Sequence, residues 1–163
     1  MSSVTTPTPQ NFIARDPIEL LSLLRRLGVS SELATQAASC LGNKLYQTIE
    51  EDPYSLCELL SASFFEVEAY ATQQGFSTDT PQRLRAGVLF LLHQETGNYF
   101  SIRSSFLRKA SRLLNVNPHQ ISHVMQTLEN EGRVVPHGEH IWTKHLNDIE
   151  GEVAERILAL CDK

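Results

Sequence analysis

The stretch DPYSLCELLSASFFEVEAYATQQGFSTDTPQRLRAG, residues 52–87, decides the fold of this chain. Its pattern predicts a helix, a tight hairpin and a second helix, and then a further helix that begins at Thr80-Pro81. In a helix-hairpin-helix motif, glycines in the hairpin let backbone N–H groups lie against a nucleic-acid phosphate. Here the hairpin reads Ser61-Ala62-Ser63-Phe64 and contains no glycine. The scaffold is typical of DNA binding, but its hairpin lacks the residues that would make the contact.

The N-terminal half of the chain is predicted to be a compact helical unit. Apolar residues recur at helical spacing over 18–27, 31–41, 44–50, 53–60 and 65–74. Capping residues followed by proline mark four helix starts along the whole chain, at Asp16-Pro17, Asp52-Pro53, Thr80-Pro81 and Asn117-Pro118.

The second half has a different pattern of elements. We expect helices over 81–93, 102–114 and 118–130, followed by short strands over 133–135 and 140–142. The sequence therefore predicts a mainly α fold, with a tandem helix-hairpin-helix unit followed by a winged-helix-like domain that carries a short β-hairpin. The expected boundaries are a flexible leader over 1–15, the two domains over 16–79 and 80–146, and a C-terminal helix over 147–163.

Charge is distributed unevenly along the chain, whose net charge is −5. Residues 1–80 carry four Lys/Arg and ten Asp/Glu, whereas residues 81–135 carry seven Lys/Arg and three Glu. Only this middle block is a plausible electrostatic footprint for nucleic acid. Within it, one side of helix 102–114 carries Arg108, Lys109 and Arg112, and together with Arg103 these residues make up a basic stripe. The stripe is either a phosphate-positioning surface or an ordinary solvated face.

The first hairpin, Leu27-Gly28-Val29-Ser30, keeps the apolar-Gly-apolar pattern of a helix-hairpin-helix turn and follows Arg25 and Arg26. It is either a seat for a phosphate or a glycine that ends a helix. The outer face of helix 118–130 is polar and, before Glu129, uncharged, so it offers base-reading groups without cations to hold phosphates.

Apolar residues outside these patterns indicate a possible partner surface. Phe64 and Phe65 belong either to the core or to a surface that stacks on a base or fills a protein interface. The C-terminal helix carries an apolar stripe, including Ile157, that needs a partner inside the fold or beyond it.

Several classes of function are not expected. No nucleotide-binding loop, catalytic triad elbow or metal-binding motif is present, and His119 and His123 lack further ligands, so we expect no enzyme, no metal and no cofactor. No run of residues is long enough to span a membrane. The three cysteines, Cys40, Cys57 and Cys161, are far apart among apolar neighbours, which predicts reduced, buried thiols in a cytoplasmic protein.

The order of motifs resembles the N-terminal region of the RecD-like superfamily 1 DNA helicases. The matching segments are LYQTIEEDPYSL (45–56), TPQRLRAGVLFLL (80–92) and LENEGRVV (128–135), and the resemblance covers roughly residues 17–160. It implies tandem helix-hairpin-helix motifs that lead into a small helical domain. The ATP-binding motor of that family would begin where this chain stops at Lys163, so translocation and ATP hydrolysis are not expected of these residues.

The sequence thus predicts a non-catalytic accessory module that holds or guides single-stranded or junction DNA, with Arg25, Arg26, Gly28 and the basic stripe as its contacts. The alternative is a protein-interaction adaptor on a degenerate DNA-binding scaffold. Its partner would be a helicase motor, another protein factor or a second copy of the chain.

Overall fold

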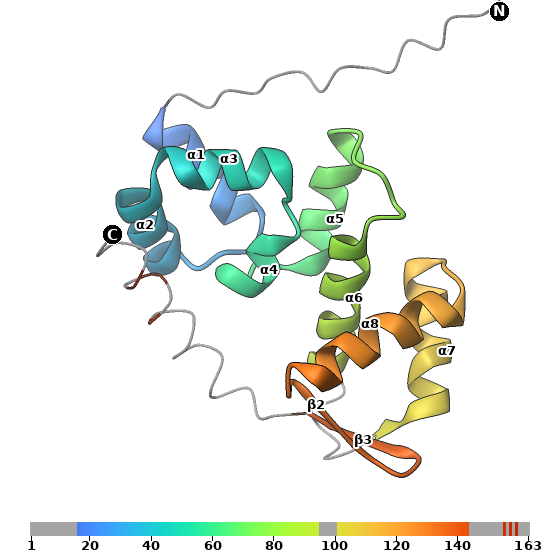
Figure 1. Cartoon of the computed structure of the whole chain (residues 1–163). Helices are drawn as coiled ribbons and strands as arrows, with labels where there is room; N and C mark the ends of the chain where they lie inside the picture. The colour runs from blue at the N-terminus through green and yellow to red at the C-terminus, as the bar shows by residue number, and fades with distance from the viewer. Residues whose placement is uncertain (1–15, 95–100, 144–154, 156, 158, 160–163) are drawn as a thin grey trace, which may run out of the picture.

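The fold is mainly helical, as predicted. A computed structural model of the chain describes residues 16–94 and 101–143, together with 155, 157 and 159 (Figure 1). Its helices are α1 (Pro17–Arg26), α2 (Ser31–Leu41), α3 (Asn43–Glu51), α4 (Ser55–Leu59), α5 (Phe64–Gln73), α6 (Pro81–Gln94), α7 (Arg103–Leu114) and α8 (Pro118–Asn130), and its strands are β1 (Ser101–Ile102), β2 (Val134–His137) and β3 (His140–Thr143). The predicted leader and most of the predicted C-terminal helix lie outside the described residues.

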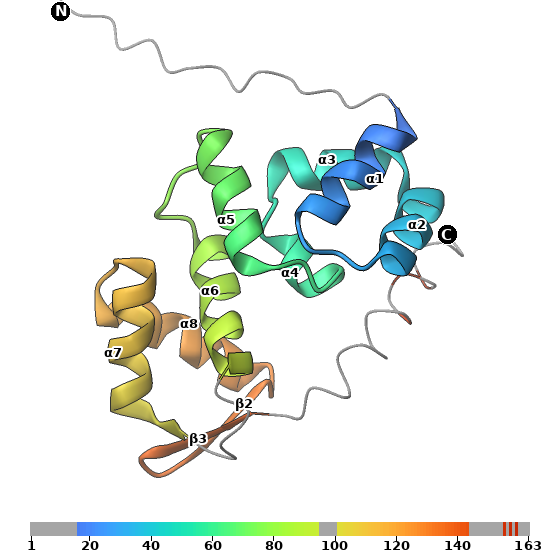
Figure 2. The same cartoon turned by 180° about the vertical axis from the view of Figure 1, so that it is seen from behind.

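Two helix-hairpin-helix motifs form the N-terminal unit. The first is α1–α2 and the second is α4–α5, with α3 between them in the chain (Figures 1 and 2). Each hairpin places a buried leucine directly before its turn, Leu27 in the first and Leu60 in the second. The backbone N–H of Ser63 donates to the carbonyl of Leu27 at 2.8 Å, so the two hairpins lie against each other.

The C-terminal unit combines helices with a small sheet, as the sequence predicts. It follows the order α6, β1, α7, α8, β2, β3, and its strands form an antiparallel sheet in the order β1-β3-β2. The predicted β-hairpin is present as β2 and β3. The sequence did not reveal β1, because two residues are too few for an alternating pattern and this strand exists only through its pairing with His140 and Ile141.

Helix α6 joins the two units. It packs against α4 and α5 on one side and against α7 and α8 on the other (Figure 1). Gly87 allows the closest approach, because a Cβ at this position would lie 2.3 Å from Cδ2 of Leu114 in α7. The buried apolar residues consequently form one continuous core across both units.

Three of the four predicted helix starts are confirmed. Asp16 accepts a hydrogen bond from the N–H of Ile18, Thr80 accepts one from Arg83, and Asn117 forms a capping box with Gln120. The prediction at Asp52-Pro53 was wrong by two residues. Successive hydrogen bonds there run back three residues rather than four, so a tight turn precedes α4 and the α-helix begins only at Ser55.

The second hairpin keeps its shape without glycine. Gly28 adopts a left-handed conformation with φ of +83°, and Ser61, at the matching position after Leu60, adopts φ of +52°. Residues that carry a Cβ rarely adopt this backbone conformation, because the Cβ approaches the following carbonyl oxygen. The absence of glycine therefore carries a cost in backbone strain but does not remove the turn.

Substitutions at the two turn residues should change the free energy of unfolding in opposite directions. Ser61 is exposed, so Ser61→Gly relieves strain, and we expect it to raise the free energy of unfolding by about 0.5 kcal/mol after the greater freedom of glycine in the unfolded chain is counted. In Gly28→Ala the new Cβ would lie 2.8 Å from the Cβ of Ser63 as well as straining φ, and we expect a loss of about 2 kcal/mol. Urea unfolding followed by circular dichroism measures both. Equal effects of the two substitutions would contradict this account of the hairpins.

Candidate nucleic-acid interface

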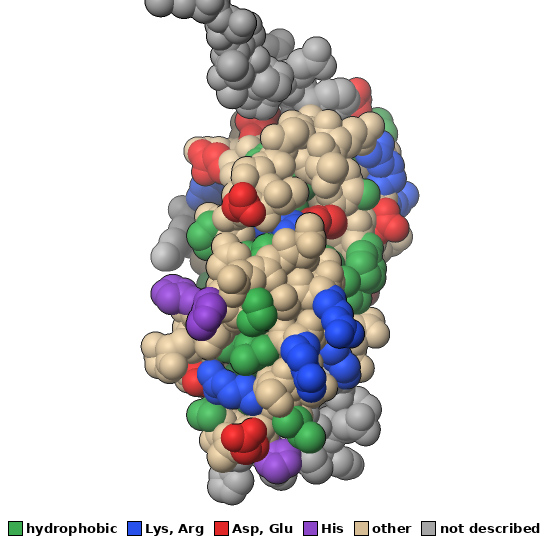
Figure 3. All heavy atoms as spheres, turned by 90° about the vertical axis from the view of Figure 1, so that its right-hand side faces the viewer, with side chains coloured by type: hydrophobic (Ala, Val, Ile, Leu, Met, Phe, Trp, Pro, Cys, Tyr) green, Lys and Arg blue, Asp and Glu red, His purple; other side chains and the backbone are tan. Residues whose placement is uncertain are grey.

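Helix α7 presents the strongest cationic surface. Its buried side carries Phe106, Ala110 and Leu114, and its opposite side exposes Arg108, Lys109 and Arg112. Figure 3 shows Lys and Arg side chains gathered on the lower half of the face that contains α7. We call these three exposed residues the α7 basic face. Exposed cations of this kind can position a phosphate backbone.

Arg103 does not belong to this face, although the sequence placed it in the basic stripe. Its guanidinium pairs with the carboxylate of Glu129 in α8, which is largely buried. Its backbone N–H donates to the carbonyl of Glu139 in the turn of the wing at 2.9 Å. Arg103 therefore fixes the start of α7 to α8 and to the wing. Arg103 is separated from the exposed cations of α7 because its half-exposed side chain lies against α8.

Other arginines of the positive block are also neutralised within the fold. Arg85 pairs with Glu58 of α4 at 2.5 Å and with Glu131, directly after α8, at 2.7 Å. Arg133 lies 3.5 Å from the same Glu58 carboxylate. The hydrogen bond from Arg85 lowers the pKa of Glu131, which keeps this carboxylate charged. Glu58 of the N-terminal unit thus pairs with two arginines of the C-terminal unit, and Glu131 adds a pair within the C-terminal unit.

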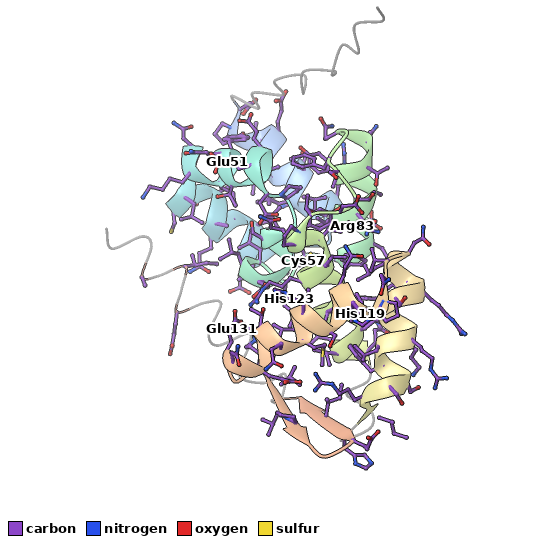
Figure 4. The ribbon with its side chains drawn as sticks, turned by 45° about the vertical axis from the view of Figure 1, so that its right-hand side comes forward. Glu51, Cys57, Arg83, His119, His123 and Glu131 are labelled. Carbon is purple, nitrogen blue, oxygen red and sulfur yellow. The ribbon has the colours of Figure 1, made fainter. Side chains whose placement is uncertain are left out.

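Arg83 lies at the centre of a buried network between the units (Figure 4). Its Nε and Nη2 atoms bind the Glu68 carboxylate at distances of 2.6–3.0 Å, and its Nη1 atom donates to the carbonyls of Thr78 and Leu114, each at 3.0 Å. The hydroxyl of Tyr54 donates to the same Glu68 carboxylate at 2.7 Å. Burial alone would raise the pKa of Glu68, but the hydrogen bonds from Arg83 and Tyr54 outweigh it and lower that pKa. Arg83 is only 6% exposed, so it is not available to a phosphate.

The first hairpin exposes its two arginines and uses the backbone N–H of its glycine within the turn. Arg25 and Arg26 are exposed in the last turn of α1. The N–H groups of Gly28 and Val29 are both used inside the turn, since they donate to the carbonyls of Arg25 and Leu24 at 3.1 Å. The side of Gly28 where a Cβ would stand faces Ser63 of the second hairpin. Gly28 thus serves the contact between hairpins, and the arginines before it are the groups open to a ligand.

The N-terminal unit matches a known family. A family model for the helix-hairpin-helix domain of the ATP-dependent RecD2 DNA helicase matches residues 15–100, more than half of the chain. The chain belongs to this family. A search of curated proteins returns no match. The match extends through α6, the helix that carries the Arg83 network and Gly87.

Membership of the RecD2 helix-hairpin-helix family indicates a DNA-binding module, and the match falls on a non-motor part of the helicase. The RLRAG segment at 83–87 lies within the matched residues. Two of its residues form interdomain ion pairs and its glycine packs against α7, so the segment holds the units together. The resemblance identified this segment, but the sequence did not show that its arginines are internal.

Two of the three residues predicted to form a partner surface lie inside the fold. Phe64 is 3% exposed and packs on Tyr54 and Phe90, and Ile157 is 2% exposed and belongs to the core. Both side chains are therefore covered by this chain itself, which favours the alternative, left open by the sequence, that they belong to the core. Phe65 differs, because 52% of its surface is exposed. Phe90, which no sequence pattern singled out, contacts both phenylalanines from α6.

The polar face of α8 is exposed as predicted, with His119 and His123 one turn apart (Figure 4). The described residues contain no group of three or more His, Cys, Asp or Glu side chains that could hold a metal ion. Over the same part of the chain, no helix is long and apolar enough to cross a membrane.

One of the three cysteines differs from its prediction, and Cys161 lies outside the described residues. Cys40 is exposed and disulfide-bonded, which corrects the expectation of a buried, reduced thiol. Cys57 is free and half-buried. Burial and the nearby carboxylates of Glu58 and Asp52 raise the pKa of Cys57 to about 12, so its thiol stays protonated and unreactive at neutral pH.

The lowered pKa of Glu68 predicts that the fold loses stability in acid. Because its pKa is lower in the folded than in the unfolded chain, it stabilises the fold above its ordinary pKa of 4.5, and this stabilisation is lost as the pH falls through the folded value. We expect unfolding free energy to fall more steeply in the wild type than in Glu68→Gln as the pH is lowered from about 6 to about 3.5. Glu68→Gln itself should lower stability at neutral pH, since it leaves Arg83 without its counter-charge. Parallel pH profiles for the two proteins, measured by thermal unfolding, would contradict the role of Glu68.

Proposed function

We propose that this chain is a DNA-binding accessory module that holds or guides single-stranded or junction DNA and has no chemistry of its own. The observation that carries this proposal is the α7 basic face, because its exposed arginines Arg108 and Arg112 have no ion-pair partner among the described residues. The other contact consists of Arg25 and Arg26, next to the first hairpin. Membership of the RecD2 helix-hairpin-helix family supports a nucleic-acid ligand for both.

The two proposed contacts lie on elements that the core ties together. Ion pairs of Arg83 and Arg85 and the close contact at Gly87 hold α6 against both units. The first hairpin and α7 are therefore held on one rigid framework, which favours a DNA segment that spans both over two independent weak sites. The overall negative charge limits non-specific affinity, so binding should depend on these few cations.

Removing the α7 basic face should weaken binding to DNA. We expect Arg108→Gln/Arg112→Gln to lower affinity for a labelled single strand and for a forked duplex. The slope of log affinity against log salt should become shallower by about 0.7–0.9 for each phosphate that the variant no longer neutralises. Affinity is measured by fluorescence anisotropy between about 50 and 200 mM salt, a range over which the wild type should bind much more weakly as salt rises.

A matched control is Lys44→Gln, which removes an exposed cation from α3, on the other side of the N-terminal unit in Figure 1. It should leave affinity and salt slope nearly unchanged. Absence of DNA binding by the wild type even at low salt would refute the proposed function for this chain. Light scattering that shows a stable self-assembly without DNA affinity would favour the adaptor alternative.

A further inference from the structure

Phe65 forms an exposed aromatic platform at the start of α5. Its ring meets that of Phe90 edge to face, with centroids 4.9 Å apart and planes at 72°. Phe64 lies beside both rings in the core, 5.8 Å from Phe65 and 5.5 Å from Phe90. Phe65 is half exposed beside a buried Phe64 and a partly buried Phe90, so it presents a flat apolar surface to the solvent.

Buried side chains packed behind Phe65 hold the aromatic platform in place. The ring of Tyr54 lies 6.4 Å from that of Phe64, and its hydroxyl donates to Glu68, which binds Arg83. The buried network between the two units therefore also supports the aromatic cluster. A ring fixed in this way loses little conformational entropy when it binds a planar ligand.

Contacts on either side place the platform between the two cationic sites. Gly28 of the first hairpin touches Ser63, only two residues before Phe65. On the other side, Phe90 lies one helical turn after Gly87, which packs against α7. Helices α1, α5 and α7 lie on the near side of the molecule in Figure 2. Along the right-hand edge of Figure 3, which belongs to this side, hydrophobic side chains separate two groups of Lys and Arg side chains.

We propose that Phe65 stacks on an unpaired nucleobase of a DNA single strand that runs from the first hairpin to the α7 basic face. This inference rests on the proposed function and specifies its ligand. Glu66, the exposed neighbour of Phe65, repels phosphate, so the contact at this point is with a base rather than with the backbone. A duplex keeps its bases stacked inside the helix and must unpair one to offer its face, whereas a single strand presents bases at no such cost.

The test compares substitutions of Phe65 on single-stranded and double-stranded DNA. Phe65→Leu keeps apolar bulk without a ring, and we expect it to bind a mixed-sequence single strand about tenfold more weakly than the wild type. Phe65→Trp should bind at least as tightly as the wild type. Affinity for a blunt duplex of the same length should be unchanged in both variants. The control Ile18→Ala removes a still more exposed apolar side chain from α1 and should leave all affinities unchanged.

A fluorescent base reports stacking directly. With 2-aminopurine in the single strand, the wild type should quench the fluorescence in at least one position of the probe, and Phe65→Leu should abolish that quenching. Circular dichroism of each variant confirms that the fold is retained. If Phe65→Leu binds the single strand as tightly as the wild type, with salt-dependent binding intact, the base-stacking proposal fails while the proposed function stands. Absence of all DNA binding in the wild type overturns both, and self-association that Phe65→Leu alone abolishes would assign the platform to a protein contact.

Discussion

The structure depends above all on the ion pair between Arg83 and Glu68. It brings a guanidinium from α6 and a carboxylate from α5 into the junction between the two units, and it adds the end of α7 through the carbonyl of Leu114. A charge that is almost fully buried is tolerated only when its partner and its hydrogen bonds are all in place. Each nitrogen of the Arg83 side chain has an acceptor, so α5, α6 and α7 must keep one relative arrangement.

The same constraint sets the electrostatics of the surface. The cations nearest the junction, Arg83 and Arg85, are neutralised by Glu68, Glu58 and Glu131 because they connect the units. Among the residues that the structure describes, the α7 basic face and the pair of arginines before the first hairpin stay exposed to an external polyanion. The seven Lys and Arg residues of the positive block, residues 81–135, thus give a smaller and more localised cationic surface in the fold. The aromatic platform at Phe65 lies between its two parts and is supported by the network of Tyr54, Glu68 and Arg83.

Much of the helical architecture was predictable because its signals are local. Capping side chains at Asp16, Thr80 and Asn117 act on N–H groups two or three residues away, so their pattern is legible without tertiary structure. The pairing of β1 with β3 is different, since it joins segments far apart in the chain, Ser101 with Ile141 and Ile102 with His140. The two residues of β1 contain no sequence pattern that would predict this pairing. The left-handed turn at Ser61 was also hidden, because a residue other than glycine adopts it only when the surrounding contacts outweigh the strain.

For the candidate site, the sequence by itself determined that Arg108, Lys109 and Arg112 share one side of a helix whose other side is apolar, because helical periodicity alone separates them. It also determined the order of motifs that identifies the RecD2 helix-hairpin-helix family. Only the tertiary structure decided which arginines are internal, since an ion pair such as Arg85 with Glu131 joins residues far apart in the chain. It likewise decided that Phe64 is buried and Phe65 exposed, because the position of α6 and its Phe90 determines which of two adjacent rings the core can cover.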